Sequence, residues 1–78
     1  MTDVRILPVD DEDFYLRLFS DILAARRFDV RTAHSAEEAL TLLQRERIDI
    51  LVTDLLMEGM GGLVLTEKVR TVYPWVDI

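Results

Sequence analysis

The chain lacks cysteine, and it has only two prolines and three glycines among its 78 residues. Without cysteine no disulfide can staple the fold, which is typical of a small domain in a reducing compartment. No apolar stretch reaches the roughly 18 residues that a membrane-spanning helix needs. The first residues, Met1-Thr2-Asp3, lack the basic and apolar regions of a signal peptide. We therefore expect a cytoplasmic protein with no membrane segment.

Positive charge is also scarce. Nine Lys and Arg face 15 Asp and Glu, for a formal net charge of −6. An acidic domain gains nothing from phosphate backbones, so this composition argues against direct binding of nucleic acid. Half of the residues are apolar, which indicates a folded domain rather than a disordered one. A chain of this length forms one small domain and buries only about 60% of its unfolded surface, so we expect marginal stability.

Short apolar runs alternate with helical patterns along the whole chain. The run before Asp10 is continuous, as in a strand buried on both faces, although Pro8 should remove one inter-strand hydrogen bond there. Ser35 and Glu38 have the spacing of a helix capping box. The expected elements are strands at residues 4–9, 28–33 and 48–53, helices at residues 14–27, 36–47 and 63–72, and the beginning of a fourth strand at residues 75–78.

This order of elements predicts an α/β fold with a parallel sheet and right-handed crossovers. The apolar line Phe14, Leu18 and Ile22 predicts that the first helix is amphipathic. The pattern stops inside an element, so the sheet is expected to be incomplete. Its last strand would present an unpaired apolar edge, through which a homodimer could form.

Three aspartates follow two of the expected strands. Asp10 and Asp11 come directly after the first strand, and Asp54 ends the third. In an open α/β sheet, ligands bind beyond the carboxyl ends of the strands. If these two strands are parallel neighbours, the three carboxylates meet at one edge, where their repulsion requires a cation or a proton. The sequence therefore predicts a hard metal ion beside a reactive carboxylate.

Two stretches, Ile6-Leu7-Pro8-Val9-Asp10-Asp11-Glu12 and Thr53-Asp54-Leu55-Leu56-Met57-Glu58-Gly59-Met60-Gly61-Gly62, resemble the receiver domain of bacterial two-component response regulators. The resemblance implies a flavodoxin-like, doubly wound parallel sheet with strand order 2-1-3-4-5 and a site where the first and third strands meet. It covers the whole chain, but residues 1–78 correspond only to the N-terminal portion of the domain, without its last strands and helices.

The resemblance also implies roles for individual residues. Asp54 matches the phosphoacceptor, and Asp10, Asp11, Asp54 and the backbone carbonyl of Leu56 match the ligands of Mg²⁺. The implied partners are a sensor histidine kinase, which donates the phosphoryl group, and a downstream output domain or protein. Such a chain is a signalling receiver that assists its own phosphorylation rather than an enzyme. The family's Ser or Thr and its Lys would lie beyond Ile78, so we expect residues 1–78 alone to phosphorylate poorly.

Other interpretations remain open at this stage. A degenerate receiver would act as a protein-interaction module without phosphorylation. A doubly wound hydrolase could use the same carboxylates, although no Ser/His or Cys/His pairing and no glycine-rich phosphate loop supports it. Taken alone, the adjacent aspartates could simply begin a helix. We expect Met57 and Met60 to serve packing and His34 to be a plain surface residue.

Overall fold

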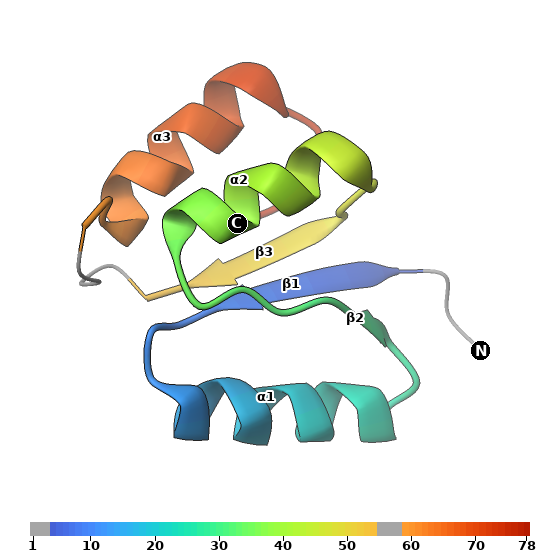
Figure 1. Cartoon of the computed structure of the whole chain (residues 1–78). Coiled ribbons are helices and arrows are strands. Elements are labelled where there is room, and N and C mark those ends of the chain that lie inside the picture. The colour runs from blue at the N-terminus through green and yellow to red at the C-terminus, as the bar shows by residue number, and fades with distance from the viewer. Residues whose placement is uncertain (1–3, 55–58) are drawn as a thin grey trace.

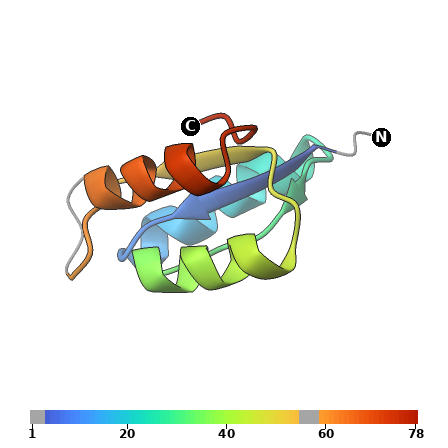
Figure 2. The same cartoon turned by 90° about the horizontal axis from the view of Figure 1, so that it is seen from above.

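The computed structural model describes residues 4–54 and 59–78. Three parallel strands form one sheet in the order β2-β1-β3, and three helices cover it, as predicted. Helix α1 lies on one face, while α2 and α3 lie side by side on the other (Figures 1 and 2). The result is an incomplete α/β domain. Its elements are β1 (Arg5–Val9), α1 (Asp13–Ala25), β2 (Asp29–Val30), α2 (Ala36–Arg45), β3 (Ile50–Thr53) and α3 (Gly62–Val72).

Strand β1 is the centre of the fold. Ile6 to Val9 are all buried, because helices cover both faces of this strand. A strand in that position needs apolar residues at consecutive positions rather than at alternate ones. Apolar side chains from both neighbouring layers complete the core. The largest fully buried side chains are Leu7, Ile48, Leu51, Leu65 and Val69.

Pro8 lies in this central strand, opposite Val52 of β3. Its carbonyl accepts a hydrogen bond of 3.1 Å from the Ala33 N–H, on the β2 side of the sheet. The N–H and C=O of a strand residue point toward the same neighbouring strand. The hydrogen bond that is missing because proline has no N–H is therefore one to the β2 side. The predicted strand at residues 28–33 is therefore too long: regular pairing covers only Asp29–Val30, and a single bridge joins Val9 to Ala33.

Helix α1 buries less of itself than its sequence pattern suggests. Leu16 is its buried residue, whereas the predicted apolar line, Phe14, Leu18 and Ile22, is exposed. The helix also ends at Ala25, two residues earlier than predicted. Arg27 then adopts a positive φ of 68°, a left-handed conformation that ends a helix.

The first turn of α2 is fixed by side chains, in agreement with the predicted cap. The Ser35 hydroxyl accepts a hydrogen bond of 3.1 Å from the Glu38 N–H. In a capping box the Glu38 carboxylate would accept a hydrogen bond from the Ser35 N–H. Here it accepts one of 3.3 Å from the N–H of His34, the residue before the N-cap. Together these bonds satisfy two backbone donors at the start of the helix.

His34 ties the beginnings of two helices together. Its Nε2 lies 2.9 Å from Oδ1 of Asp13, the first residue of α1, and its Nδ1 lies 3.9 Å from Oε2 of Glu38. The hydrogen bond with Asp13 raises the pKa of His34, and the charge of Glu38 adds to this effect. His34 is therefore more than a surface residue, although 52% of its side chain is exposed.

The chain after α3 returns to the free edge of β3. The Leu51 N–H donates to the Asp77 carbonyl at 2.7 Å, and the Asp77 N–H donates to the Asp49 carbonyl at 2.9 Å. This forms one parallel bridge, between Ile50 and Asp77. It is the beginning of the fourth strand that the sequence predicts, on the side of β3 away from β1.

The Ser35 cap gives a direct test of how α2 is stabilised. We expect Ser35→Ala to lower the free energy of unfolding by about 1 kcal/mol, because the Glu38 N–H loses its acceptor. Thr41→Ala is the matched control, since this exposed hydroxyl bonds only to the Glu37 carbonyl inside the same helix. Urea unfolding of both variants measures the difference, and equal stability of the two would contradict the cap.

His34 should make stability depend on pH. Because its pKa is raised in the folded state, its stabilisation is complete below its ordinary pKa of about 6.5 and is lost as the pH rises through the folded pKa. When the pH rises from 5.5 to 8.5, we expect the free energy of unfolding to fall further in the native chain than in His34→Gln. The difference between the two falls should be less than about 1 kcal/mol, because the ion pair is exposed. Parallel pH profiles of urea unfolding for the two chains would contradict this ion pair.

Candidate functional site

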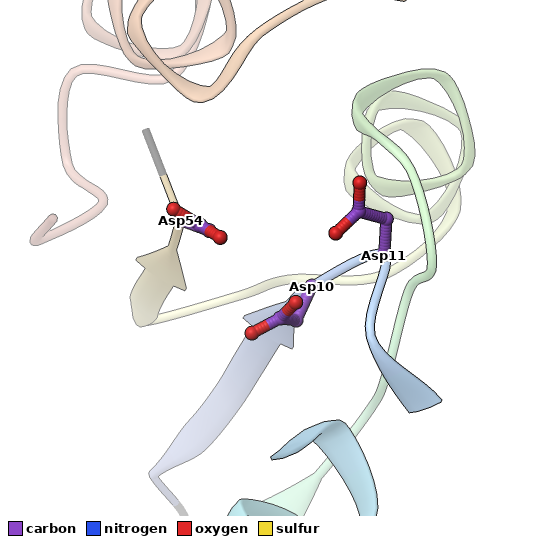
Figure 3. A group of neighbouring side chains, drawn as sticks. All are labelled: Asp10, Asp11 and Asp54. Carbon is purple, nitrogen blue, oxygen red and sulfur yellow. The ribbon is translucent and has the colours of Figure 1, made fainter. Parts of the chain in front are cut away.

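Three carboxylates converge at the carboxyl ends of β1 and β3. The strands are parallel neighbours, and Val9 at the end of β1 lies opposite Thr53 at the end of β3. Asp10, Asp11 and Asp54 each offer one carboxylate oxygen, and these oxygens all lie within 4.8 Å of one another. Figure 3 shows the three side chains approaching from the two strand ends. The structure thus brings together the three aspartates that the sequence singles out.

Backbone hydrogen bonds hold the strand ends in place. The Asp54 N–H donates to the Val9 carbonyl at 3.3 Å, and the Asp10 N–H donates to the Ala33 carbonyl at 3.1 Å. The Asp10 carboxylate also accepts a hydrogen bond of 2.9 Å from the Glu12 N–H, which turns the chain toward α1. Asp10 is half-buried, whereas Asp11 and Asp54 are exposed to solvent.

A cavity of about 250 Å³ opens beside the carboxylates, between α1 and β3. Asp10 and Asp54 form its polar wall, and Tyr15, Phe19 and Val52 belong to its apolar wall. Sequence reasoning missed this contribution of α1. The spacing of Tyr15 and Phe19, four residues apart, places them on one side of the helix but does not show that this side borders the acidic cluster.

The donor set suits a hard cation. Three carboxylates this close together repel one another unless a cation or a proton reduces their charge. Their oxygens are the ligands that Mg²⁺ prefers, with the remaining positions left to water or phosphate. The described residues place no histidine in this group of potential ligands, which favours magnesium over zinc.

The turn after Asp54 is described only in part. Leu56, whose backbone carbonyl is expected to be a further ligand, lies outside the described residues, as do Met57 and Glu58. Gly59 follows them with a φ of 74°, a conformation that glycine adopts at little cost. Met60 is partly buried against the hydrophobic core, which confirms its expected packing role.

Within residues 4–54 and 59–78, no helix has the length and hydropathy that crossing a membrane would require.

Known proteins resemble this chain in both sequence and structure. The alginate biosynthesis transcriptional regulatory protein AlgB of Pseudomonas putida is 40% identical over 74 residues, which cover 95% of this chain and 16% of AlgB. The crystal structure of a CheY-like response regulator receiver domain protein from Methanospirillum hungatei has a TM-score of 0.92 at 29% identity and covers 96% of this chain and 60% of that protein.

A second solved structure carries a ligand complex. The response regulator TrrA of Thermotoga maritima, crystallised in complex with Mg²⁺ and BeF, has a TM-score of 0.87 at 31% identity, over 91% of this chain and 62% of TrrA. The chain thus spans less than two thirds of the length of each of these proteins. Residues 6–78 match the family described as the response regulator receiver domain. The chain belongs to the response regulator receiver domain family.

Proposed function

We propose that this receiver accepts a phosphoryl group on Asp54 with the help of Mg²⁺, in signalling from a sensor histidine kinase. The convergence of three carboxylate oxygens within 4.8 Å is the observation that carries the proposal. Asp10, Asp11, Asp54 and the backbone carbonyl of Leu56 would hold the ion. The complex of TrrA with Mg²⁺ and BeF lends support from a related protein.

The proposed reaction is an in-line displacement. A carboxylate oxygen of Asp54 attacks phosphorus, a new O–P bond forms, and the bond from phosphorus to the donor's imidazole nitrogen breaks. The leaving imidazole keeps the bonding electrons and takes a proton from solvent. Bound Mg²⁺ would supply the positive charge that lets an anionic carboxylate approach an anionic phosphoryl group. Asp10 and Asp11 would orient the ion and take no covalent part.

The kinase needs a docking surface beside Asp54, and α1 offers one. Phe14, Leu18 and Ile22 are exposed on this helix, while Tyr15 lines the cavity that also contains Asp54. An apolar helix face next to a reactive carboxylate suits a partner that presents its own helices. We propose that the phosphodonor protein docks here.

The output and the assembly of the chain are further parts of the proposal. AlgB is named a transcriptional regulatory protein, which supports an attached or separate output partner. We propose the cytoplasm as the place where the chain acts. We propose that residues 1–78 form the N-terminal portion of a receiver domain. The hydrogen bonds of Asp77 cover only part of the edge of β3, and a second copy pairing along the rest of this edge would give a homodimer.

Magnesium binding is the first test of the site. We expect Asp11→Asn to weaken Mg²⁺ binding at least tenfold in calorimetric titration, because a neutral amide replaces a charged ligand. Asp21→Asn is the matched control, since it removes one exposed carboxylate from the surface of α1 and should leave the affinity unchanged. Equal affinity of native and Asp11→Asn chains would show that the ion does not bind at this cluster.

Phosphorylation is the second test. Incubated with Mg²⁺ and a small acyl phosphate, the chain should be labelled at Asp54 to well below one phosphoryl group per molecule, because the expected Ser or Thr and Lys are absent from residues 1–78. Removing Mg²⁺ with a chelator and Asp54→Asn should each abolish the label, which mass spectrometry can locate.

The possible outcomes separate the competing interpretations. Labelling that persists in Asp54→Asn would overturn the assignment of the phosphoacceptor. Absence of both magnesium binding and labelling would favour the alternative, a degenerate receiver that acts as a phosphorylation-independent interaction module. Full stoichiometric labelling would instead contradict the need for residues beyond Ile78.

A further inference from the structure

A second cavity lies at the opposite end of the sheet from the aspartates. It has a volume of about 290 Å³ and sits between the last turn of α2, the segment that leads into β3 and the segment after α3. Leu43, Ile48 and Val76 are the buried residues among those that line it. This cavity is not part of the phosphorylation site, and nothing in the proposed reaction uses it.

An ordered aromatic wall flanks the cavity. Trp75 packs edge-on against Tyr73, with 5.7 Å between the ring centroids and an interplanar angle of 89°. The guanidinium carbon of Arg47 lies 6.0 Å from the centroid of the Trp75 ring. Even so, 54% of Trp75 is exposed. A large aromatic surface that is fixed in place and open to solvent is typical of a binding site.

Two of the three charged residues that line the cavity are arginines, on a chain whose net charge is −6. Arg45 and Arg47 are both exposed, and Arg47 has 72% of its side chain in solvent, with Asp49 its nearest carboxylate at 3.6 Å. Glu46, which lies between them, is already engaged by Arg31 at 2.9 Å and by Arg5 at 3.5 Å. The one acidic residue of the lining is therefore neutralised from outside the cavity.

We propose that this cavity binds a short acidic peptide segment of a partner protein. An apolar side chain of the peptide would lie against Trp75, and neighbouring carboxylates would pair with Arg45 and Arg47. Carboxylates suit this rim because guanidinium groups bind them through two parallel hydrogen bonds. A chain of net charge −6 repels an extended polyanion, which disfavours nucleic acid, whereas a peptide supplies apolar contact and a few charges at once.

The helix dipole of α2 does not help the cavity to bind an anion. The carboxyl end of α2 carries the negative pole of the helix dipole, so the helix itself does not attract an anion. The two arginine side chains must do so. Their loss should remove binding without affecting the aspartates at the other end of the strands.

A selection with an internal counter-screen tests the proposal. A library of random octapeptides is selected on the immobilised chain after depletion on the Arg45→Gln, Arg47→Gln double variant. We expect enrichment of sequences with Asp or Glu beside a large apolar residue. A selected peptide, synthesised with blocked ends, is then titrated while the fluorescence of Trp75, the single tryptophan, is followed. The affinity is taken from the midpoint of the titration and not from the size of the fluorescence change, because Arg47→Gln can itself alter the fluorescence of Trp75.

We expect Arg47→Gln to weaken binding of the peptide at least fivefold and the double variant at least twentyfold. Arg26→Gln is the control, because Arg26 is also exposed but lies at the end of α1, on the other face of the sheet. Circular dichroism and urea unfolding show that each variant remains folded. The proposal would be overturned if the selection on the native chain yielded no more acidic sequences than a selection on the double variant. Equal affinity of the peptide for the native chain and all variants would overturn it as well. Tighter binding of a short single-stranded oligonucleotide than of the peptide would replace it with a nucleic-acid site.

Discussion

The parallel pairing of β1 with β3 is the interaction on which the rest of this molecule depends, because it brings three carboxylates together. Left to themselves, Asp10, Asp11 and Asp54 would separate, because like charges this close cost free energy. The paired ends of β1 and β3 prevent that, and the buried residues of β1 hold the pairing in place. A cation bound at the proposed site would reduce this repulsion, so its binding and the stability of the fold would be thermodynamically linked.

Much of the fold and of the acidic site could be predicted from the sequence, because both depend on local patterns. Continuous apolar runs indicate strands covered on both faces, and the spacing of Ser35 and Glu38 indicates where α2 begins. The site follows from topology, since residues at the carboxyl ends of neighbouring parallel strands must meet. Asp10, Asp11 and Asp54 could be placed together once the resemblance supplied the strand order.

Other features could not be predicted, because contacts between distant segments decide them. The apolar line of α1 has the correct period, but which side of the helix is covered depends on how the helix crosses the sheet. The pairing of His34 with Asp13 joins the segment before α2 to the first residue of α1, and the sequence does not reveal the distance between them. Glu46 likewise looks like a free charge beside Arg45, and only the fold shows that Arg31 already neutralises it.

Pro8 divides the sheet into two halves of unequal strength. Toward β3 the register is regular over four residue pairs, whereas toward β2 it covers two pairs and a bridge. Fluctuations that open the sheet should therefore begin along the seam between β1 and β2, where the regular register is shorter. Asp54 is tied to the end of β1 across the other seam, whereas Asp10 bonds across this one, to the Ala33 carbonyl. Opening of the outer strand would therefore release the backbone of Asp10 while Asp54 stays bonded to Val9, so the two sides of the acidic cluster differ in how firmly they are held.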